Sequence, residues 1–163
     1  MRHVQFIVLL AIVLAISTGI SCRPGIKADN TEAWKDLYGV EVKELLRIGS
    51  GDLANDPYVF SGINDLRFDA ADNVYVLDRR ESLIKVFSPT GEYLRAYQLN
   101  KGQGPGEFQR PLGFDIGPKG NLFITDSNSR RITAIDQAGR LVGEMTLRAI
   151  PESIAVDKEG SVY

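Results

Sequence analysis

The sequence LRFDAADNVYVLD at residues 66–78 returns in altered form as FDIGPKGNLFITD at residues 114–126. The two stretches align without a gap at an offset of 48, and the same offset continues beyond them. The pairs related by this offset are Asn73 and Asn121, Asp78 and Asp126, Ile84 and Ile132, Phe87 and Ile135, and Gly91 and Gly139. The chain therefore contains an internal repeat, and the repeat is the strongest sequence signal for its fold.

A third copy starts near Pro151, where IAVDKEGSVY at residues 154–163 matches residues 114–123 at an offset of 40. The first repeat is thus eight residues longer than the second. We attribute the difference to a longer connection in the first repeat, which contains KGQGPGEF at residues 101–108.

The repeats are built from short β-type segments separated by turn residues. The expected strands are residues 40–43, 65–68, 74–77, 83–87, 93–99, 122–125, 132–136 and 141–147, with a further strand starting at Pro111. Closely spaced short strands without helical periodicity indicate an all-β protein. Four short strands in each period of roughly 40 to roughly 50 residues indicate the blades of a β-propeller. Segments 74–77 and 122–125 carry apolar side chains on both faces, as expected for an inner strand packed between blades.

These residues resemble the NHL-repeat type of six-bladed β-propeller. The resemblance rests on DNVYVLD through Gly91, and on GNLFITD through Arg131, Ile132 and Gly139. It covers roughly residues 40–163 and implies two and a half blades, near residues 63–110, 111–150 and 151–163. The chain looks in particular like lipoprotein propellers that carry a GQGPGEF-like segment between blades. The first repeat departs from the family pattern at residues 79–83, where a small polar loop is usual.

A partial propeller would expose blade faces and strand edges. We therefore expect the sequence to be an N-terminal fragment of a longer protein. The alternative is a small open sheet that closes by oligomerising.

The first residues have the pattern of an export signal. A short basic start precedes an apolar run at residues 4–16, small polar residues follow, and Cys22 is the only cysteine. Ile20, Ser21 and Cys22 resemble the end of a bacterial lipobox, although Gly19 stands where leucine is usual. The resemblance implies a signal peptide at 1–21, acylation of Cys22, a tether at 22–38 and a propeller domain at 39–163. The alternatives are an uncleaved membrane anchor and a cysteine that lies near an ordinary cleavage site by chance.

The glycines of KGQGPGEF raise the possibility of a phosphate-binding loop. The spacing does not fit a dinucleotide fingerprint, because the third glycine position from Gly102 is Glu107. Pro105 lacks an N–H group, and no Gly-Lys-Ser/Thr sequence is present. We interpret the segment as a hinge between blades, in which Gly104 and Gly106 serve the turn.

Other catalytic and ligand-binding signals are weak. Loss of residues 1–21 would remove the single histidine, which excludes histidine-based nucleophilic and zinc chemistry in the mature chain. An EF-hand starting at Asp69 fails at three positions: Ala71, Val74 and Arg80. We expect five aspartates to be turn residues: Asp65, Asp69, Asp72, Asp78 and Asp126. Gly91 and Gly139 are expected to close turns. Four arginines are expected to be solvated turn residues rather than a nucleic-acid site: Arg79, Arg80, Arg130 and Arg131. The sequence thus predicts no catalytic, cofactor-binding or metal-binding residue, although a pair of the Glu107 and Asp115 carboxylates remains possible.

The sequence favours an exported, lipid-anchored propeller at the bacterial envelope, as an outer-membrane lipoprotein facing the periplasm or the cell surface. Its expected partners are the bilayer, through acylated Cys22, and a protein, peptide or glycan ligand; no nucleic acid is expected. The expected role is binding or scaffolding. The alternative is an enzyme, because NHL-like propellers include lyases and hydrolases whose metal and catalytic residues would lie in later blades. A purely structural spacer is a third possibility.

Overall fold

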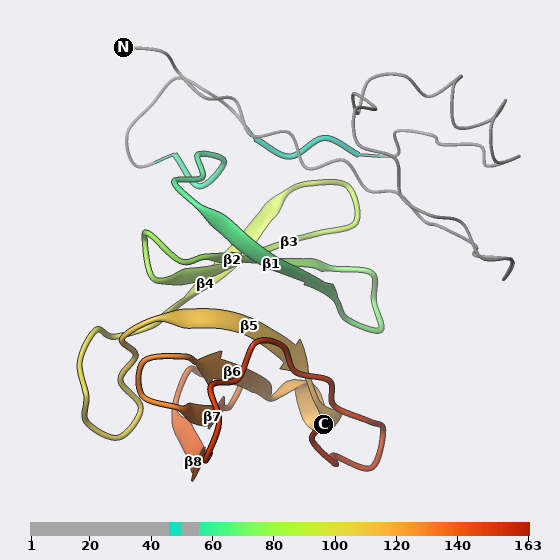
Figure 1. Cartoon of the computed structure of the whole chain (residues 1–163). Helices are drawn as coiled ribbons and strands as arrows, with labels where there is room; N and C mark the ends of the chain where they lie inside the picture. Colours follow the sequence, from blue (N-terminus) through green and yellow to red (C-terminus); the bar gives the residue numbers. More distant parts are fainter. Residues whose placement is uncertain (1–45, 50–55) are drawn as a thin grey trace, which may run out of the picture.

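The computed structural model describes residues 46–49 and 56–163, which form two antiparallel four-stranded sheets (Figure 1). In the first sheet the strands lie in the order β1 (Ile63–Phe68), β2 (Val74–Asp78), β3 (Leu83–Phe87) and β4 (Tyr93–Gln98). In the second sheet the order is β5 (Pro111–Ile116), β6 (Leu122–Asp126), β7 (Arg131–Ile135) and β8 (Leu141–Thr146). A short 3-10 turn, η1 (Pro118–Gly120), joins β5 to β6. Each sheet is one blade, so the predicted all-β propeller architecture is confirmed.

The internal repeat is visible in the strand register. Val74 pairs with Phe87 in the first blade, and Leu122 pairs with Ile135 at the equivalent position of the second. A third copy of the turn between the first two strands follows, where the N–H of Asp157 donates to the carbonyl of Ser161. The expected strand at residues 40–43 lies outside the described residues.

The main core lies between the two blades. β2 is buried along its whole length because both of its faces are covered. The face towards the second blade contributes to a cluster with members from both sheets: Tyr75, Leu77, Ile84, Val86, Tyr97, Leu99, Phe108, Phe114, Leu122, Ile124 and Ile135. The other face packs against the segment before β1, in a second cluster of Ile48, Phe60, Val74, Val76 and Phe87. The alternating apolar side chains of β2 thus pack against neighbours on both faces of the first blade, as the sequence pattern predicts.

The connections between strands divide between two ends of the blades. We call one the turn end, which carries the connections at residues 69–73, 88–92, 117–121, 136–140 and 157–160. The other is the loop end, which carries the connections at residues 79–82, 99–110, 127–130 and 147–150. In Figure 1 the long connection from β4 to β5 lies on the left, whereas the connections from β1 to β2 and from β3 to β4 lie on the right.

Two expectations about single residues are wrong. Arg131 is not a solvated turn residue but lies at the start of β7, where its side chain is only 12% exposed. Asp65 is not a turn residue but lies inside β1, where its side chain points to the neighbouring blade. A period-2 pattern places a residue on one face of a strand, but it does not show which charged residues face another strand.

Among the described residues, no helix is long and apolar enough to cross a membrane.

Candidate functional site

The carboxylate that closes the second strand of each blade organises the loop end. Asp126 is fully buried, and its Oδ2 accepts hydrogen bonds from the N–H groups of Gln109 (2.6 Å) and Arg110 (2.9 Å). Its Oδ1 accepts from the N–H groups of Asn128 (3.0 Å) and Ser129 (2.9 Å). Burial by itself would raise the pKa of Asp126, but the N–H donors, Ser129 first, lower it below its ordinary value. Asp126 therefore fastens the connection from the preceding blade to the turn that follows β6.

Asp78 has the same role in the first blade. Its Oδ2 accepts from the N–H of Ser61 at 2.6 Å, and its Oδ1 accepts from the N–H of Glu81 at 3.3 Å. The donors Ser61 and Gln109 are themselves related by the offset of the repeat. Both carboxylates thus accept hydrogen bonds from main-chain N–H groups of the loop end.

The glycines of KGQGPGEF do not offer a phosphate cradle. The N–H of Gly104 donates to Glu107 Oε2 at 2.8 Å, and the N–H of Gly106 donates to Glu144 Oε1 at 2.9 Å. The N–H of Gly102 donates to the carbonyl of Phe108 at 3.1 Å. A Cβ on Gly102 would overlap the Glu107 carboxylate, so a side chain there would displace this carboxylate from the loop. The N–H groups of the three glycines thus already donate to two carboxylates and one carbonyl of the protein.

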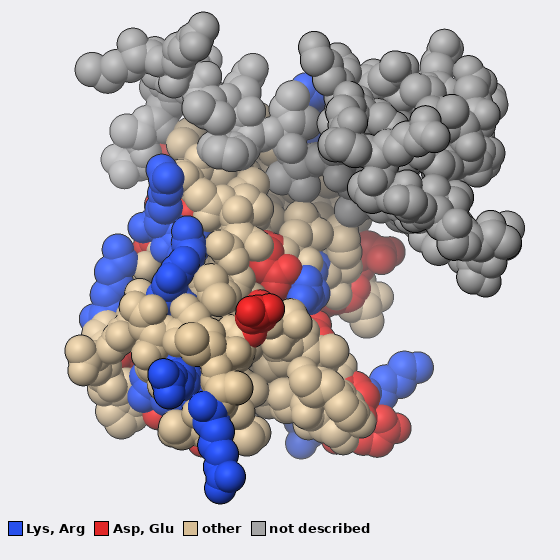
Figure 2. Space-filling view, viewed as in Figure 1, with Lys and Arg blue, Asp and Glu red and all other residues tan. Residues whose placement is uncertain are grey.

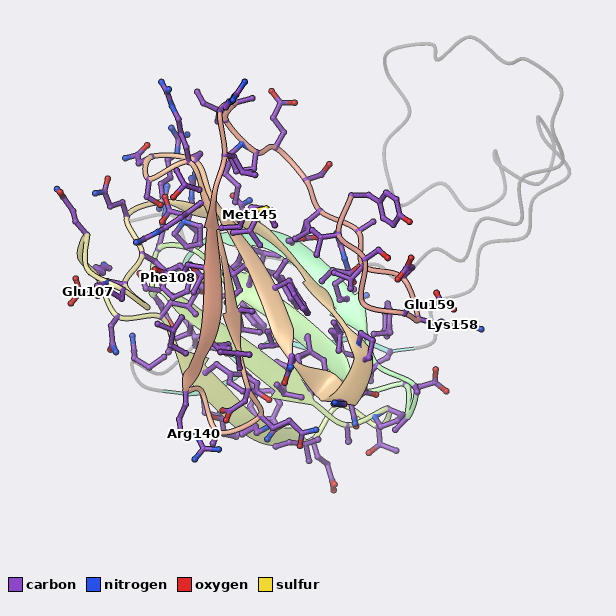
Figure 3. All side chains as sticks on the ribbon, turned by 90° about the horizontal axis from the view of Figure 1, so that it is seen from below. Glu107, Phe108, Arg140, Met145, Lys158 and Glu159 are labelled. Atoms are coloured by element: carbon purple, nitrogen blue, oxygen red, sulfur yellow. The ribbon has the colours of Figure 1, made fainter. Side chains whose placement is uncertain are left out.

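The end of this loop lies between the blades. Phe108 is only 2% exposed and belongs to the cluster formed by both sheets, and Figure 3 shows Phe108 turned towards the strands beside Glu107 at the edge. Arg131 on β7 donates from Nη2 to the carbonyls of Glu107 (2.8 Å) and Gly104 (3.2 Å). Glu144 faces the same guanidinium at 3.4 Å. The loop is therefore held in place by the buried side chain of Phe108 and by the hydrogen bonds from Arg131 of the second blade.

The segment before β1 repeats this arrangement, which sequence reasoning missed. Lys85 on β3 is buried, donates from Nζ to the carbonyl of Val59 at 2.6 Å, and pairs with Glu81 at 3.0 Å. Its Nζ also lies 5.0 Å from the centre of the Phe60 ring. The available signal was the match of the PYVF sequence at residues 57–60 to the PGEF sequence at residues 105–108, again at the offset of the repeat.

The two glycines expected to close turns lie at the turn end. Gly91 has a φ of 87° and Gly139 a φ of 76°, and their N–H groups donate back to the carbonyls of Ser88 and Asp136. Gly106 also has a positive φ, of 72°. Such angles favour glycine because it lacks a Cβ. Cys22 lies outside the described residues.

Charged side chains meet where the innermost strands of the two blades, β1 and β5, lie side by side (Figure 1). Asp65 Oδ2 accepts from the N–H of Phe114 at 3.0 Å and therefore joins the blades. Arg67 contacts Asp65 at 2.5 Å and lies 3.6 Å from Asp115. Asp115 Oδ2 in turn accepts from the N–H of Val156 in the third copy, at 2.7 Å. We name Asp65, Arg67 and Asp115 the inner-strand ladder.

The ladder is the best candidate functional site in the described part of the chain. Its side chains are half-buried: the exposed fractions are 17% for Asp65, 31% for Arg67 and 21% for Asp115. Both carboxylates are held by main-chain donors, so the charges are fixed in position before any ligand arrives. The possible pair of Glu107 with Asp115 does not form, because Glu107 binds the loop while Asp115 binds the third copy. Within residues 46–49 and 56–163, no group of three His, Cys, Asp or Glu side chains could hold a metal ion.

The sequence could have indicated the ladder only in part. Asp65 and Arg67 are two residues apart and so share one face of a strand. Their partner Asp115 is the equivalent of Arg67 in the second repeat and belongs to no catalytic motif. The stacking of β1 beside β5 was needed to bring the three charges together.

Solved structures with this fold share little sequence with the chain. A putative exported protein from Bacteroides fragilis superposes with a TM-score of 0.54 at 18% identity, covering 68% of this chain and 31% of its own. A protein of unknown function from Bacteroides caccae gives a TM-score of 0.53 at 19% identity, covering 74% and 42%. Virginiamycin B lyase from Staphylococcus aureus gives a TM-score of 0.51 at 18% identity, covering 68% and 36%.

At these identities the likeness shows the fold alone. The chain spans roughly a third of the length of the structures that it matches, with 30% for a hydrazine synthase and 36% for the lyase. No curated protein matches the sequence. The model of a family described as "6-bladed beta-propeller" matches residues 54–163, about two thirds of the chain, and the chain therefore belongs to this six-bladed propeller family.

Proposed function

We propose that this protein is an exported, lipid-anchored propeller that binds a protein, peptide or glycan at the bacterial envelope without converting it. The observation that carries the binding role is the inner-strand ladder of Asp65, Arg67 and Asp115. Its charges are partly exposed, and the two carboxylates are already held by the N–H groups of Phe114 and Val156. Fixed, partly desolvated charges favour recognition of a polar ligand, because little ordering is required on binding.

A binding role also fits the state of the other buried carboxylates. Asp78 and Asp126 use their lone pairs to accept hydrogen bonds from main-chain N–H groups of the loop end. General acid–base catalysis needs a group that can exchange a proton with the substrate, and the hydrogen bonds to Asp126 favour its charged form. The described blades thus supply a rigid frame and a polar surface.

The envelope location rests on the sequence. Residues 1–21 have the pattern of a secretory signal, and Cys22 follows at the place where a lipoprotein would be acylated. Residues 22–38 would then link the lipid to the propeller. The superposition on a putative exported protein from Bacteroides fragilis is compatible with this location.

A ligand screen with chemical readout tests this proposal. The full-length protein with Cys22→Ser, prepared without its signal peptide, is applied to an array of bacterial cell-wall glycans and peptides, and the bound species are then analysed by mass spectrometry. We expect binding with the ligand recovered at unchanged mass. Recovery of cleaved or eliminated products would instead favour the lyase or hydrolase alternative.

A variant of the ladder makes the screen specific. Arg67→Gln removes the cation that lies between two carboxylates, and we expect at least a tenfold loss of affinity for any ligand that binds there. Arg95→Gln is the matched control, because Arg95 lies on the outer strand β4 and donates to the carbonyl of Gln137. Equal affinity of both variants and the parent protein would exclude the ladder as the binding site.

A further inference from the structure

The surface charges of the two blades are segregated between the ends. The loop end carries six basic residues on its connections: Arg79, Arg80, Lys101, Arg110, Arg130 and Arg148. Five of the six are exposed, and Arg79 is half-buried. In the described part of the chain, none of the six forms an ion pair within 4.0 Å. Figure 2 shows blue side chains gathered along the left side, over the loop end of Figure 1.

The acidic side chains at the loop end do not neutralise these six basic residues. Asp78 and Asp126 are fully buried under main-chain donors. Glu81 is paired with Lys85, and Glu107 accepts a hydrogen bond from the N–H of Gly104. Glu152, just after the last connection, is the exposed acidic residue there.

The turn end has the opposite balance. Its connections carry six acidic residues against three basic ones: Asp69, Asp72, Glu92, Asp136, Asp157 and Glu159 against Lys119, Arg140 and Lys158. Figure 3 shows Lys158 and Glu159 on the side of the molecule away from Glu107 and Phe108. Without residues 1–21 the chain has 18 basic and 21 acidic residues, a net charge of −3. Attraction to an anionic surface therefore requires an orientation in which the loop end faces it.

We propose that the loop end docks on the anionic phospholipid surface of the bilayer to which the protein is anchored. This inference rests on the proposed function, because the lipid on Cys22 would hold the domain close to that surface. The six cations are spread over two blades rather than converging on one point, and their long side chains form no ion pair with another residue that the structure describes. Such a distribution suits a surface of many mobile headgroups better than one compact ligand.

The anchor and the patch would reinforce each other. Acyl chains on Cys22 would hold the domain at the bilayer, and a basic patch adds electrostatic attraction to anionic lipids. A short tether also raises the local concentration of the headgroups around the domain. The exposed side chain of Ile150, close to Arg148 and 56% exposed, adds an apolar group to the same surface. Docking would fix the orientation of the propeller, with its turn end directed away from the membrane.

Vesicle sedimentation tests the docking independently of the anchor. The full-length Cys22→Ser protein, without its signal peptide, is mixed with vesicles of phosphatidylcholine alone or with phosphatidylglycerol added. We expect co-sedimentation only with the anionic vesicles, and its loss as the salt concentration rises, because surface charges are screened. No binding to anionic vesicles would overturn the docking proposal while leaving acylation of Cys22 untouched.

A matched pair of double variants tests the orientation. Lys101→Gln/Arg148→Gln removes two exposed charges from the loop end, and we expect the partition coefficient to fall about 25-fold, roughly fivefold per charge. Lys119→Gln/Lys158→Gln removes two exposed charges from the turn end, and we expect no more than a twofold change. Equal losses in the two pairs would contradict the proposal, since net charge rather than the loop end would then control binding.

A soluble acidic polysaccharide separates the membrane from a glycan ligand. Polygalacturonate is titrated into the same Cys22→Ser protein, and we expect weaker binding than to phosphatidylglycerol vesicles at equal anion concentration. Tighter binding to polygalacturonate, lost in the Lys101→Gln/Arg148→Gln pair, would overturn membrane docking and assign the loop end to an acidic glycan.

Discussion

Asp126 carries the largest share of the hydrogen bonds that fasten the loop end of the second blade. It is fully buried and accepts four main-chain N–H groups. Asp126→Ala would leave these donors without partners, and we expect a loss of about 3 kcal/mol in the free energy of unfolding. Urea denaturation monitored by circular dichroism measures the loss.

A matched carboxylate at the turn end provides the control. Asp136 also accepts from main-chain N–H groups, those of Ala138 and Arg140, but its turn is exposed to solvent. We expect Asp136→Ala to cost clearly less than Asp126→Ala, because water can replace the lost acceptor. Equal losses would mean that burial of the Asp126 donors is not the source of its effect.

The acid side of the stability profile follows from the same residues. Burial opposes ionisation of Asp126 and Asp69, but hydrogen bonds from their neighbours outweigh it, and the pKa of each lies below its ordinary value. A carboxyl with a lower pKa in the folded state stabilises the fold fully above its unfolded pKa, about 3.9, and this contribution is lost as the pH falls through the folded value. We expect the urea midpoint to decrease below about pH 4.

Asp126→Asn makes the pH experiment specific. The variant cannot ionise at this position, so we expect a lower midpoint at neutral pH and a flatter decrease in acid. A variant profile parallel to that of the parent would show that other carboxyl groups dominate the acid transition.

At the scale of elements, the loop that contains KGQGPGEF packs its last residue, Phe108, between the two blades. Phe108 is 2% exposed in a core that both sheets share. Phe108→Ala would open a cavity there, and we expect a loss of about 3–4 kcal/mol in unfolding free energy. Phe68→Ala is the control, because Phe68 is 40% exposed at the end of β1, and we expect it to cost less than about 1 kcal/mol. Similar losses in both variants would show that Phe108 does not join the blades.

The elements were the most predictable part of the molecule. The strands follow from alternating apolar residues between turn signals, and the register follows from the alignment of Asn73 with Asn121 and of Asp78 with Asp126. Contacts between repeats were not predictable in this way. The hydrogen bond from the N–H of Phe114 to Asp65 spans 49 residues and depends on how one blade stacks on the next. The repeat shows which residues are equivalent, but not which residues of adjacent blades touch.

At the scale of the whole molecule, the blades combine three features with separate tasks. Stacked apolar faces hold the sheets together. The inner-strand ladder places fixed charges on the innermost strands, β1 and β5. Under the docking proposal, the segregated charges of the loop end and the turn end would orient the molecule near an anionic surface. The charge segregation was hidden in the sequence, because its six cations lie on four connections that come together only in the folded blades.

The proposed anchoring through Cys22 would connect these features to the proposed role at the envelope. Mass spectrometry of the N-terminal peptide tests this anchoring most directly. The protein is expressed with its own signal in a bacterium that processes lipoproteins, and it is extracted from the membrane fraction. The account predicts that the mature chain starts at Cys22 and carries acyl chains. A mature chain that starts at another residue, or an unmodified Cys22, would contradict it.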